Sequence, residues 1–431
     1  MILTILIFIV ILGLLVFVHE LGHFLVAKRS GVRVDEFGFG FPPRIFGIQQ
    51  IVVEKIEKIS EERKDTNLRV ESYDLASGEQ TVSEIETEQK QEIERITQTK
   101  KWCFFWGNKP KQQEGEIQRD ETVYSINAIP LGGFVKIYGE EGEGINSSRS
   151  FASKKAGQKM KILFAGVIMN FILAVFLFSL GNVIGLPSAI DENQIDQFPG
   201  ARLQIVAVSQ GSPAVSAGLQ AGDFVVALKN SDGKVIQDIK KPSDFQAFVD
   251  NEKGKQIFVA VQRGNSTVDI SVIPRSNPPS GQGPLGVELA TVAKISLPWY
   301  KAIWEGFMTT INLVWLLLVV LFQVVKNLIV SGRAGVDVVG PVGIYTLTNQ
   351  AATMGFIYLL QLTAILSINL AVINAFPFPA LDGGRVLFLM IEKIKGSPVN
   401  IKTQNLIHSI GFVLLILLMV AITYRDVVRF F

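Results

Sequence analysis

The 431-residue sequence contains only one cysteine and three histidines, and its formal net charge is +2. The single cysteine, Cys103, excludes an internal disulfide and a redox motif of the C-x-x-C type. The small net charge gives no global electrostatic reason to expect nucleic acid as a partner. Apolar residues are abundant instead, at 48% of the chain, and charged residues make up 19%. This composition is typical of a membrane protein with soluble insertions.

Charge is missing altogether from residues 2–18. Together with residues 19–27 they would form a helix of about 39 Å, which is long enough to cross a hydrocarbon core of about 30 Å. A cleavable signal peptide is the less favoured interpretation, because the run lacks a basic start and a small-residue cleavage site. Further apolar runs occupy residues 160–186, 304–330, 355–376 and 405–424. The chain is therefore predicted to be polytopic.

Charges beside these runs predict their orientation. Lysines and arginines follow the first run and precede the second, so these ends face the cytoplasm by the positive-inside rule, and residues 187–300 lie outside. The run at 304–330 has a short apolar core, and a full crossing there would invert the run at 355–376. We therefore predict a polytopic α-helical membrane protein with four transmembrane helices, at 1–30, 155–186, 355–395 and 403–425. Residues 300–330 are predicted to form an interfacial or re-entrant helix.

Two stretches between the runs have soluble composition. Residues 51–121 form a charged cytoplasmic insert, in which isoleucines and valines at helical spacing predict short amphipathic or partly disordered helices. Within it, "KKWCFFWGNKPK" (100–111) alternates aromatics with lysines. That composition suits either an anionic membrane surface or a local hydrophobic cluster, and the sequence does not decide between them.

Residues 187–291 alternate strand-like runs with glycine turns, which predicts one small β-rich domain. The stretch "GSPAVSAGLQAGDFVVALKN" (211–230) resembles the signature of PDZ domains. The resemblance implies one extracytoplasmic PDZ domain that binds a peptide or protein ligand as an added strand.

The stretch "VFVHELGHFLVAK" (16–28) places His19, Glu20 and His23 inside the first apolar run. Residues four apart share one face of a helix, and H-E-x-x-H is the pattern in which two histidines bind Zn²⁺ and the glutamate acts as general base. A carboxylate inside a span costs about 2.5 kcal/mol or more unless it faces a polar partner. A bound metal ion provides such a partner, so we predict a site for one Zn²⁺.

A zinc site with two histidines needs a further protein ligand. In "NAFPFPALDGGRVLF" (374–388), prolines end an apolar helix and Asp382 follows, which makes Asp382 the candidate carboxylate ligand. His408 is the competing candidate, but it stands alone in an apolar helix and is expected to be structural. Replacing Asp382 should lose metal, whereas replacing His408 should not.

Together these motifs resemble the site-2 protease family of intramembrane zinc metalloproteases, and within it the bacterial branch typified by regulator of sigma E protease. The segments 38–47 and 124–140 are similar to that family's membrane-associated β-hairpin region, which we place at 31–50 and 122–145. The insert at 51–121 and the presence of one PDZ domain instead of two depart from that branch.

The resemblance implies that His19, His23 and Asp382 bind zinc, that Glu20 is catalytic and that Asn374 engages the substrate. It also implies that an extended edge at Gly38, Phe39 and Gly40 holds the unwound substrate as an added strand. An asparagine near a helix break also caps free backbone groups, so a structural role for Asn374 stays open.

The implied function is cleavage of transmembrane segments of single-span membrane proteins, such as anti-sigma factors or remnant signal peptides, in the inner (cytoplasmic) membrane of a bacterial cell. The lipid bilayer and membrane-protein substrates are the expected partners, with no nucleic acid. The alternative is a non-catalytic PDZ membrane receptor with a structural metal site. Glu20 disfavours it, because a closed structural zinc site has no use for an adjacent base.

Overall fold

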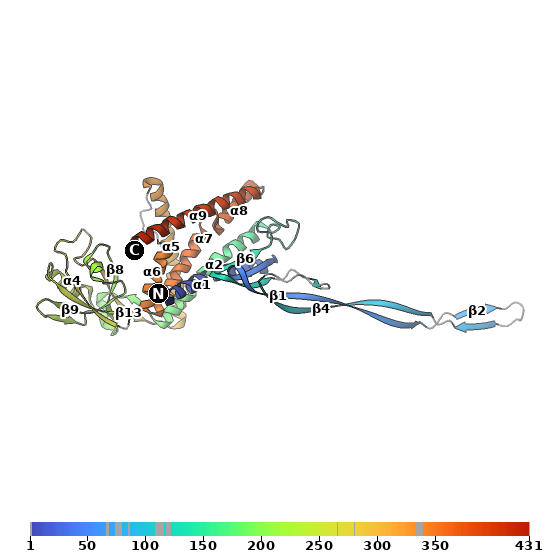
Figure 1. Ribbon diagram of the computed structural model, residues 1–431, viewed down its shortest axis with the longest axis horizontal. Coiled ribbons are helices and arrows are strands. Elements are labelled where there is room, and N and C mark those ends of the chain that lie inside the picture. The colour runs from blue at the N-terminus through green and yellow to red at the C-terminus, as the bar shows by residue number, and fades with distance from the viewer. Residues whose placement is uncertain are drawn as a thin grey trace.

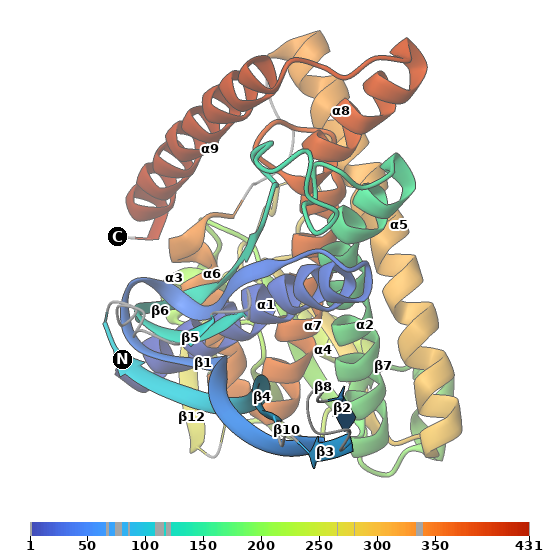
Figure 2. The same cartoon turned by 90° about the vertical axis from the view of Figure 1, so that its right-hand side faces the viewer.

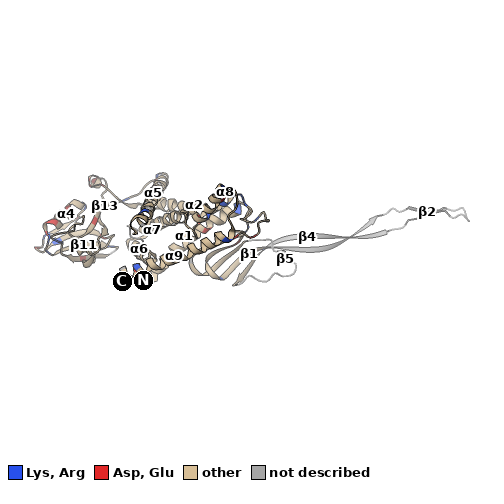
Figure 3. Ribbon diagram, turned by 90° about the horizontal axis from the view of Figure 1, so that it is seen from above, with Lys and Arg blue, Asp and Glu red and all other residues tan. Residues whose placement is uncertain are grey.

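The computed structural model describes residues 2–65, 69–73, 80–84, 87–107, 116–117, 122–264, 266–279, 281–332 and 339–430. Long helices form the centre of the molecule, a small sheet domain lies at one end, and a long two-stranded ribbon extends from the other (Figure 1). The central helices carry few charged residues, whereas charges gather in the small domain and around α8 (Asp382–Lys395) (Figure 3).

Five helices in the described residues are long and apolar enough to cross a membrane: α1 (Ile2–Arg29), α2 (Ala156–Ile184), α5 (Trp299–Ser331), α7 (Phe356–Ala375) and α9 (Ile401–Phe430). The expected count of four is therefore not confirmed. Residues 299–331 form one continuous helix of 33 residues, about 50 Å long, which is long enough to cross a membrane. Its bounds agree with the predicted helix at 300–330, and its expected interfacial or re-entrant placement stays a prediction.

The order of the helices explains how α7 keeps the predicted direction although α5 is long. The backbone N–H of Leu297, just before α5, donates to the carbonyl of Asn182 near the end of α2, so α5 begins where α2 ends. α7 also begins at the small domain, where Gln204 donates to the Tyr358 hydroxyl at 3.2 Å. Helix α6 (Pro341–Met354), which we did not predict, precedes α7 and ends beside the same domain. α5 and α7 thus both lead away from it.

α7 ends at Ala375, and α8 begins at Asp382. The segment predicted as a single span at 355–395 is therefore two helices. The break falls at Pro377 and Pro379, as the sequence indicated, because proline lacks the backbone donor that would continue the helix.

A twisted sheet packs against α1 (Figure 2). It is formed by β1 (Val34–Asp65), β4 (Thr87–Trp106), β5 (Glu116–Ile117) and β6 (Val123–Ile137). The first part of β1 pairs with both halves of β6, and the later part of β1 pairs with the first half of β6 and with β4. The predicted hairpin region at 31–50 and 122–145 provides the strands that contact α1.

The expectation of helices in the insert at 51–121 is wrong for residues 51–65 and 87–106. These residues are the long antiparallel arms of β1 and β4, and β2 (Arg69–Tyr73) pairs with β3 (Gln80–Glu84) farther out. The register places Ile56 opposite Ile96 and Glu57 opposite Arg95, and residue pairs of these kinds favour antiparallel strands. The remainder of the insert lies outside the described residues.

The small domain comprises seven strands, two α-helices and the short 3₁₀ helix η1 (Glu192–Gln197). The strands are β7 (Leu186–Ala189), β8 (Arg202–Val208), β9 (Phe224–Asn230), β10 (Val235–Gln237), β11 (Ile257–Arg263), β12 (Ser266–Val272) and β13 (Val287–Ile295). The sheet order is β12-β11-β9-β8-β13-β7, with β10 on β9. Helices α3 (Pro213–Ala217) and α4 (Pro242–Asn251) complete it.

This domain has its own hydrophobic core, built from residues of both the sheet and α4, among them Leu203, Ile205, Leu228, Phe245 and Val259. A buried carboxylate, Asp223, accepts two hydrogen bonds from Arg263 at 2.7 and 2.8 Å. These bonds raise the pKa of Arg263 above its usual value. The domain is thus a separately packed unit slightly larger than the predicted 187–291.

Candidate metal centre

The two histidines of the H-E-x-x-H motif lie on the buried face of α1 that meets α2. They share that face because residues four apart are one helical turn apart. The two Nε2 atoms are 3.2 Å apart, and both rings are almost fully buried. A close approach of the helices makes this possible, since a Cβ at Gly22 would come within 2.3 Å of the Ala165 carbonyl oxygen.

Asp382, 359 positions after His23, completes the cluster. Its Oδ2 lies 2.9 Å from Nε2 of His19 and 3.3 Å from Nε2 of His23. It is the first residue of α8, which folds back under the end of α7. The glycines after it permit that fold, because a Cβ at Gly383 would meet the Phe376 carbonyl oxygen at 2.3 Å. The glycines therefore act through close packing.

The second nitrogen of each histidine is also held. Nδ1 of His23 donates to the carbonyl of Ile162 at 2.8 Å, which leaves Nε2 as the free lone pair. Nδ1 of His19 lies 3.3 Å from the side-chain amide of Asn170, whose own Oδ1 has no other partner. With the amide turned around, that oxygen accepts the proton of Nδ1 and gives His19 the same tautomer.

Asn170 is a residue that our sequence analysis missed. It is fully buried on α2. The Ser367 hydroxyl of α7 donates to the backbone carbonyl oxygen of Asn170 at 2.8 Å, so this residue connects three helices at the centre. The available signal was an amide inside an apolar run, because such residues usually serve a specific polar partner.

The three ligand atoms of His19, His23 and Asp382 lie within 4.8 Å of one another. Two neutral imidazoles and a carboxylate are the ligand set that catalytic zinc takes, with one position left for water. The hydrogen-bonded Nδ1 atoms add the outer support that such sites have. This chemistry fits Zn²⁺.

Glu20 interacts electrostatically with all three of these side chains, and the backbone N–H of Val135 on β6 forms a hydrogen bond with its carboxylate. Arg385, one turn after Asp382 on α8, also interacts with Glu20 and forms an ion pair with Glu140. The glutamate is therefore held between the metal ligands and β6, in reach of a group that reacts at the cluster.

The remaining predicted site residues fall in different places. Asn374 is half-buried in the last turn of α7, beside the start of α8, and its expected substrate contact stays a prediction. His408 lies outside the cluster: its Nδ1 accepts a hydrogen bond at 2.9 Å from the backbone N–H of Ala380, which has a φ of 79°. It supports the turn that presents Asp382, in agreement with the structural role we expected.

The expected free edge at Gly38, Phe39 and Gly40 is wrong. Gly38 and Phe39 pair with one half of β6 on one side and with the other half on the other side, so this strand is interior. A Cβ at Gly38 would also clash with Phe134 at 2.5 Å. Among the described strands, the free edge nearest Glu20 is the second half of β6, residues 133–137.

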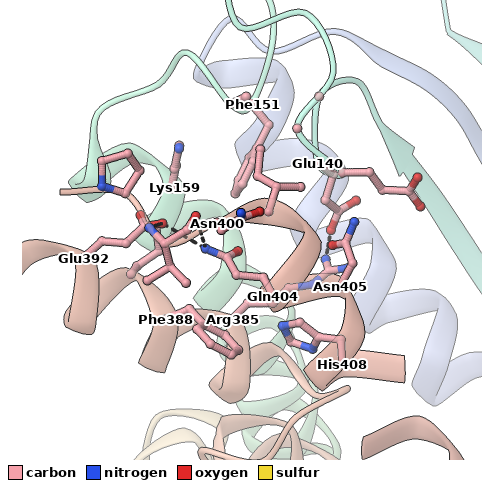
Figure 4. Close-up of a pocket in the computed structure, with 18 of the residues that line it drawn as sticks. Glu140, Phe151, Lys159, Arg385, Phe388, Glu392, Asn400, Gln404, Asn405 and His408 are labelled. Carbon is pink, nitrogen blue, oxygen red and sulfur yellow. Dashed lines mark hydrogen bonds and ion pairs between the residues drawn. The ribbon is translucent and has the colours of Figure 1, made fainter. Parts of the chain in front are cut away.

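A cavity of about 900 Å³ lies beside α8, from Arg385 onward (Figure 4). It lies between α8, the start of α9, the start of α2 and the loop after β6. Polar side chains line much of it, including Glu140, Lys159, Arg385, Gln404 and His408. It brings polar surface to within one helical turn of the cluster.

Comparisons with known proteins agree with this geometry. Peptidase family M50 matches residues 7–54 and 115–418, and the match skips residues 55–114, which include all of β4. Over 99% of both chains, this chain is 31% identical to the regulator of sigma-W protease RasP of Bacillus subtilis and 29% identical to the probable protease eep of Enterococcus faecalis. It is 30% identical to a putative zinc metalloprotease of Clostridium perfringens over 96% of this chain and 95% of that one.

Proposed function

The chain belongs to peptidase family M50, the site-2 proteases, and is a zinc metalloprotease; from this premise we propose that it cleaves transmembrane segments of single-span membrane proteins. His19, His23 and Asp382 hold the zinc ion, and Glu20 is the general base. The observation that carries the assignment is the meeting of α1 and α8 residues within 4.8 Å, inside a bundle of apolar helices.

Zinc bound at this centre would supply a Lewis acid that polarises the scissile carbonyl and acidifies water. Glu20 takes the proton of the attacking water and gives it to the leaving amine, since it is the base placed beside the ligands. The N–H of Val135 fixes the Glu20 carboxylate against β6. The polar cavity lined by Arg385 and His408 comes within one helical turn of Asp382, and in this proposal water reaches the centre from that side.

A helical substrate hides its carbonyl groups in its own hydrogen bonds, so the cleaved segment must unwind and find new partners. The second half of β6 offers them, because this edge has no other strand on it among the described residues and it lies beside Glu20. An extended substrate would add to it as an antiparallel strand. Asn374, at the end of α7, would contact that segment from the opposite side.

The small domain acts as a PDZ domain in this proposal. A cavity of about 300 Å³ lies between α4 and β13, lined by Phe245, Val249, Leu285, Val287 and Leu289. On the side that faces this cavity, residues 287–290 pair with no other described strand. An apolar cleft beside an open strand edge suits an extended peptide. We place this domain outside the bacterial cytoplasmic membrane, since lysines and arginines flank the opposite ends of α1 and α2.

The test of this function uses the purified Glu20→Gln variant, reconstituted in lipid membranes together with a purified substrate. The variant should retain zinc and bind a single-span substrate, yet lose cleavage by a factor of at least about 100, because only the base is removed. The substrates would be anti-sigma-factor and remnant signal-peptide segments. Full cleavage by this variant would refute the role of Glu20, and cleavage of soluble unfolded proteins alone would refute the substrate class.

The same variant locates the substrate. A photo-crosslinking residue at Lys136, exposed on the free half of β6, should capture the trapped substrate. A matched residue at Tyr124, on the half of β6 that is paired on both sides, should not. Equal capture at both positions would exclude strand addition at this edge.

A further inference from the structure

The sheet beside α1 has one face that is apolar and exposed. Trp102, Phe104 and Trp106 on β4 have exposed fractions of 54%, 64% and 76%, and Ile126 on β6 has 52%. Phe46 and Ile48 of β1 lie between these strands, and the Phe46 ring is 5.5 Å from that of Trp106. We call this set the aromatic face: Phe46, Ile48, Trp102, Phe104, Trp106 and Ile126.

The strand register shows that the aromatic face continues the surface on which α1 packs. Directly paired residues point to the same side of a sheet. One row of pairs runs Phe37, Tyr124, Ile48, Phe104. Phe24 of α1 stacks on Phe37 at 4.7 Å and contacts the Tyr124 ring at 5.9 Å. α1 thus covers the beginning of this row and leaves its end exposed.

The opposite side of the sheet is different in kind. There Arg44 and Ser125 donate hydrogen bonds to Glu36, and Arg44 lies over the ring of Phe105 at 5.6 Å. Gln49 and Phe105 on this side are buried. The sheet is therefore amphipathic, with its polar groups paired on one side and bulky apolar groups exposed on the other, beside a helix apolar enough to cross a membrane.

The position of this row of residues along α1 indicates what covers its exposed end. Phe24 stands four residues, about 6 Å, before Lys28 and Arg29 at the basic end of α1. That is the level at which tryptophan and tyrosine gather in membrane proteins, below the headgroups and above the hydrocarbon centre.

The family resemblance already implies that the hairpin region at 31–50 and 122–145 is membrane-associated; we propose that β4 of the insert extends it, so that Trp102, Phe104 and Trp106 complete an aromatic face that lies in the interface of the lipid bilayer beside α1 and anchors the sheet there. The insert supplies half of this surface, because Trp102, Phe104 and Trp106 lie in the part of the chain that the family match skips. The anchor fixes the height of β6 relative to Glu20, since β1 joins β4 to both halves of β6. The proposal rests on α1 crossing the bilayer and not on the protease activity.

The test places one nitroxide label at a time on the full-length protein in vesicles of phosphatidylethanolamine and phosphatidylglycerol. Cys103→Ser removes the native thiol, and Phe104→Cys, Ile126→Cys or Lys101→Cys supplies the attachment point. Lys101 is the matched control, because it is exposed on the same strand but its side chain lies on the other side of the sheet. Zinc content checks that each variant is folded.

Labels at 104 and 126 should collide several-fold more with oxygen than with a water-soluble nickel chelate, and the label at 101 should show the reverse. If the labels at 104 and 126 are as open to the nickel chelate as the label at 101, the face lies in water and the proposal is refuted. If both are shielded from oxygen and nickel alike, a second copy of the chain covers the face, which refutes it equally. Neither result depends on turnover, so the proposed function is tested separately.

Discussion

Gly166 on α2 is the position where the smallest change should disturb the metal centre most. A Cβ built there would lie 2.4 Å from Nε2 of His23 and 2.7 Å from Nε2 of His19. Ordinary contacts of a Cβ begin at 3.4 Å, so the imidazoles would have to move by about 1 Å. Zinc sites tolerate about 0.2 Å in their ligand distances. Gly166→Ala should therefore lower zinc affinity by at least about tenfold, comparable to the loss of an outer hydrogen bond.

Gly157→Ala is the matched control, because it lies on the same helix and a Cβ there would have open space around it. Both variants make the same chemical change, so a difference between them reports the contact with the histidines. The assay is metal content by mass spectrometry after dialysis against a graded zinc buffer, with thermal unfolding to check the fold. If Gly166→Ala binds zinc as tightly as Gly157→Ala does, the histidines do not sit against this glycine and the described geometry is wrong.

Three further predictions concern the ligands, their support and the small domain. Asp382→Ala should abolish stoichiometric zinc and His408→Ala should retain it, as measured by metal content; the opposite pattern would exchange their roles. Asn170→Leu should lower the zinc affinity by about tenfold and Asn170→Asp should restore it, because only the latter keeps an acceptor for the His19 ring. Equal zinc affinities of the two variants would show that Asn170 does not support His19. Arg263→Ala should destabilise the small domain by about 2 kcal/mol, because it leaves the carboxylate of Asp223, which is 1% exposed, buried without its ion-pair partner. Limited proteolysis of the full chain would detect this loss of stability, and unchanged resistance to the protease would contradict it.

The cluster itself was predictable to a considerable extent. His19 and His23 follow from helical spacing alone, since four residues in any α-helix bring side chains to one face. Asp382 followed from a different local rule, the helix break at Pro377 and Pro379, which the structure places between Ala375 and Asp382. The spacing of residues along the sequence could not show that these two segments meet in space.

Other predictions failed because they depended on partners that a single segment does not reveal. The arm at 51–65 has isoleucines at helical spacing, but it forms a strand paired with 87–106, and the register places Ile56 opposite Ile96 and Glu57 opposite Arg95. Gly38 was predicted to lie at a free sheet edge, but both halves of β6 pair with its strand.

The sequence alone determined which segments are apolar, where the paired histidines and their glutamate lie, and where a proline-rich break presents a carboxylate, because these are properties of a few neighbouring residues. Only the tertiary structure decided that Asp382 meets His19, that Asn170 and Ile162 orient the rings, and that β6 supplies the open edge. Each of these depends on contacts between residues tens to hundreds of positions apart, and such contacts are fixed by the packing of the whole chain.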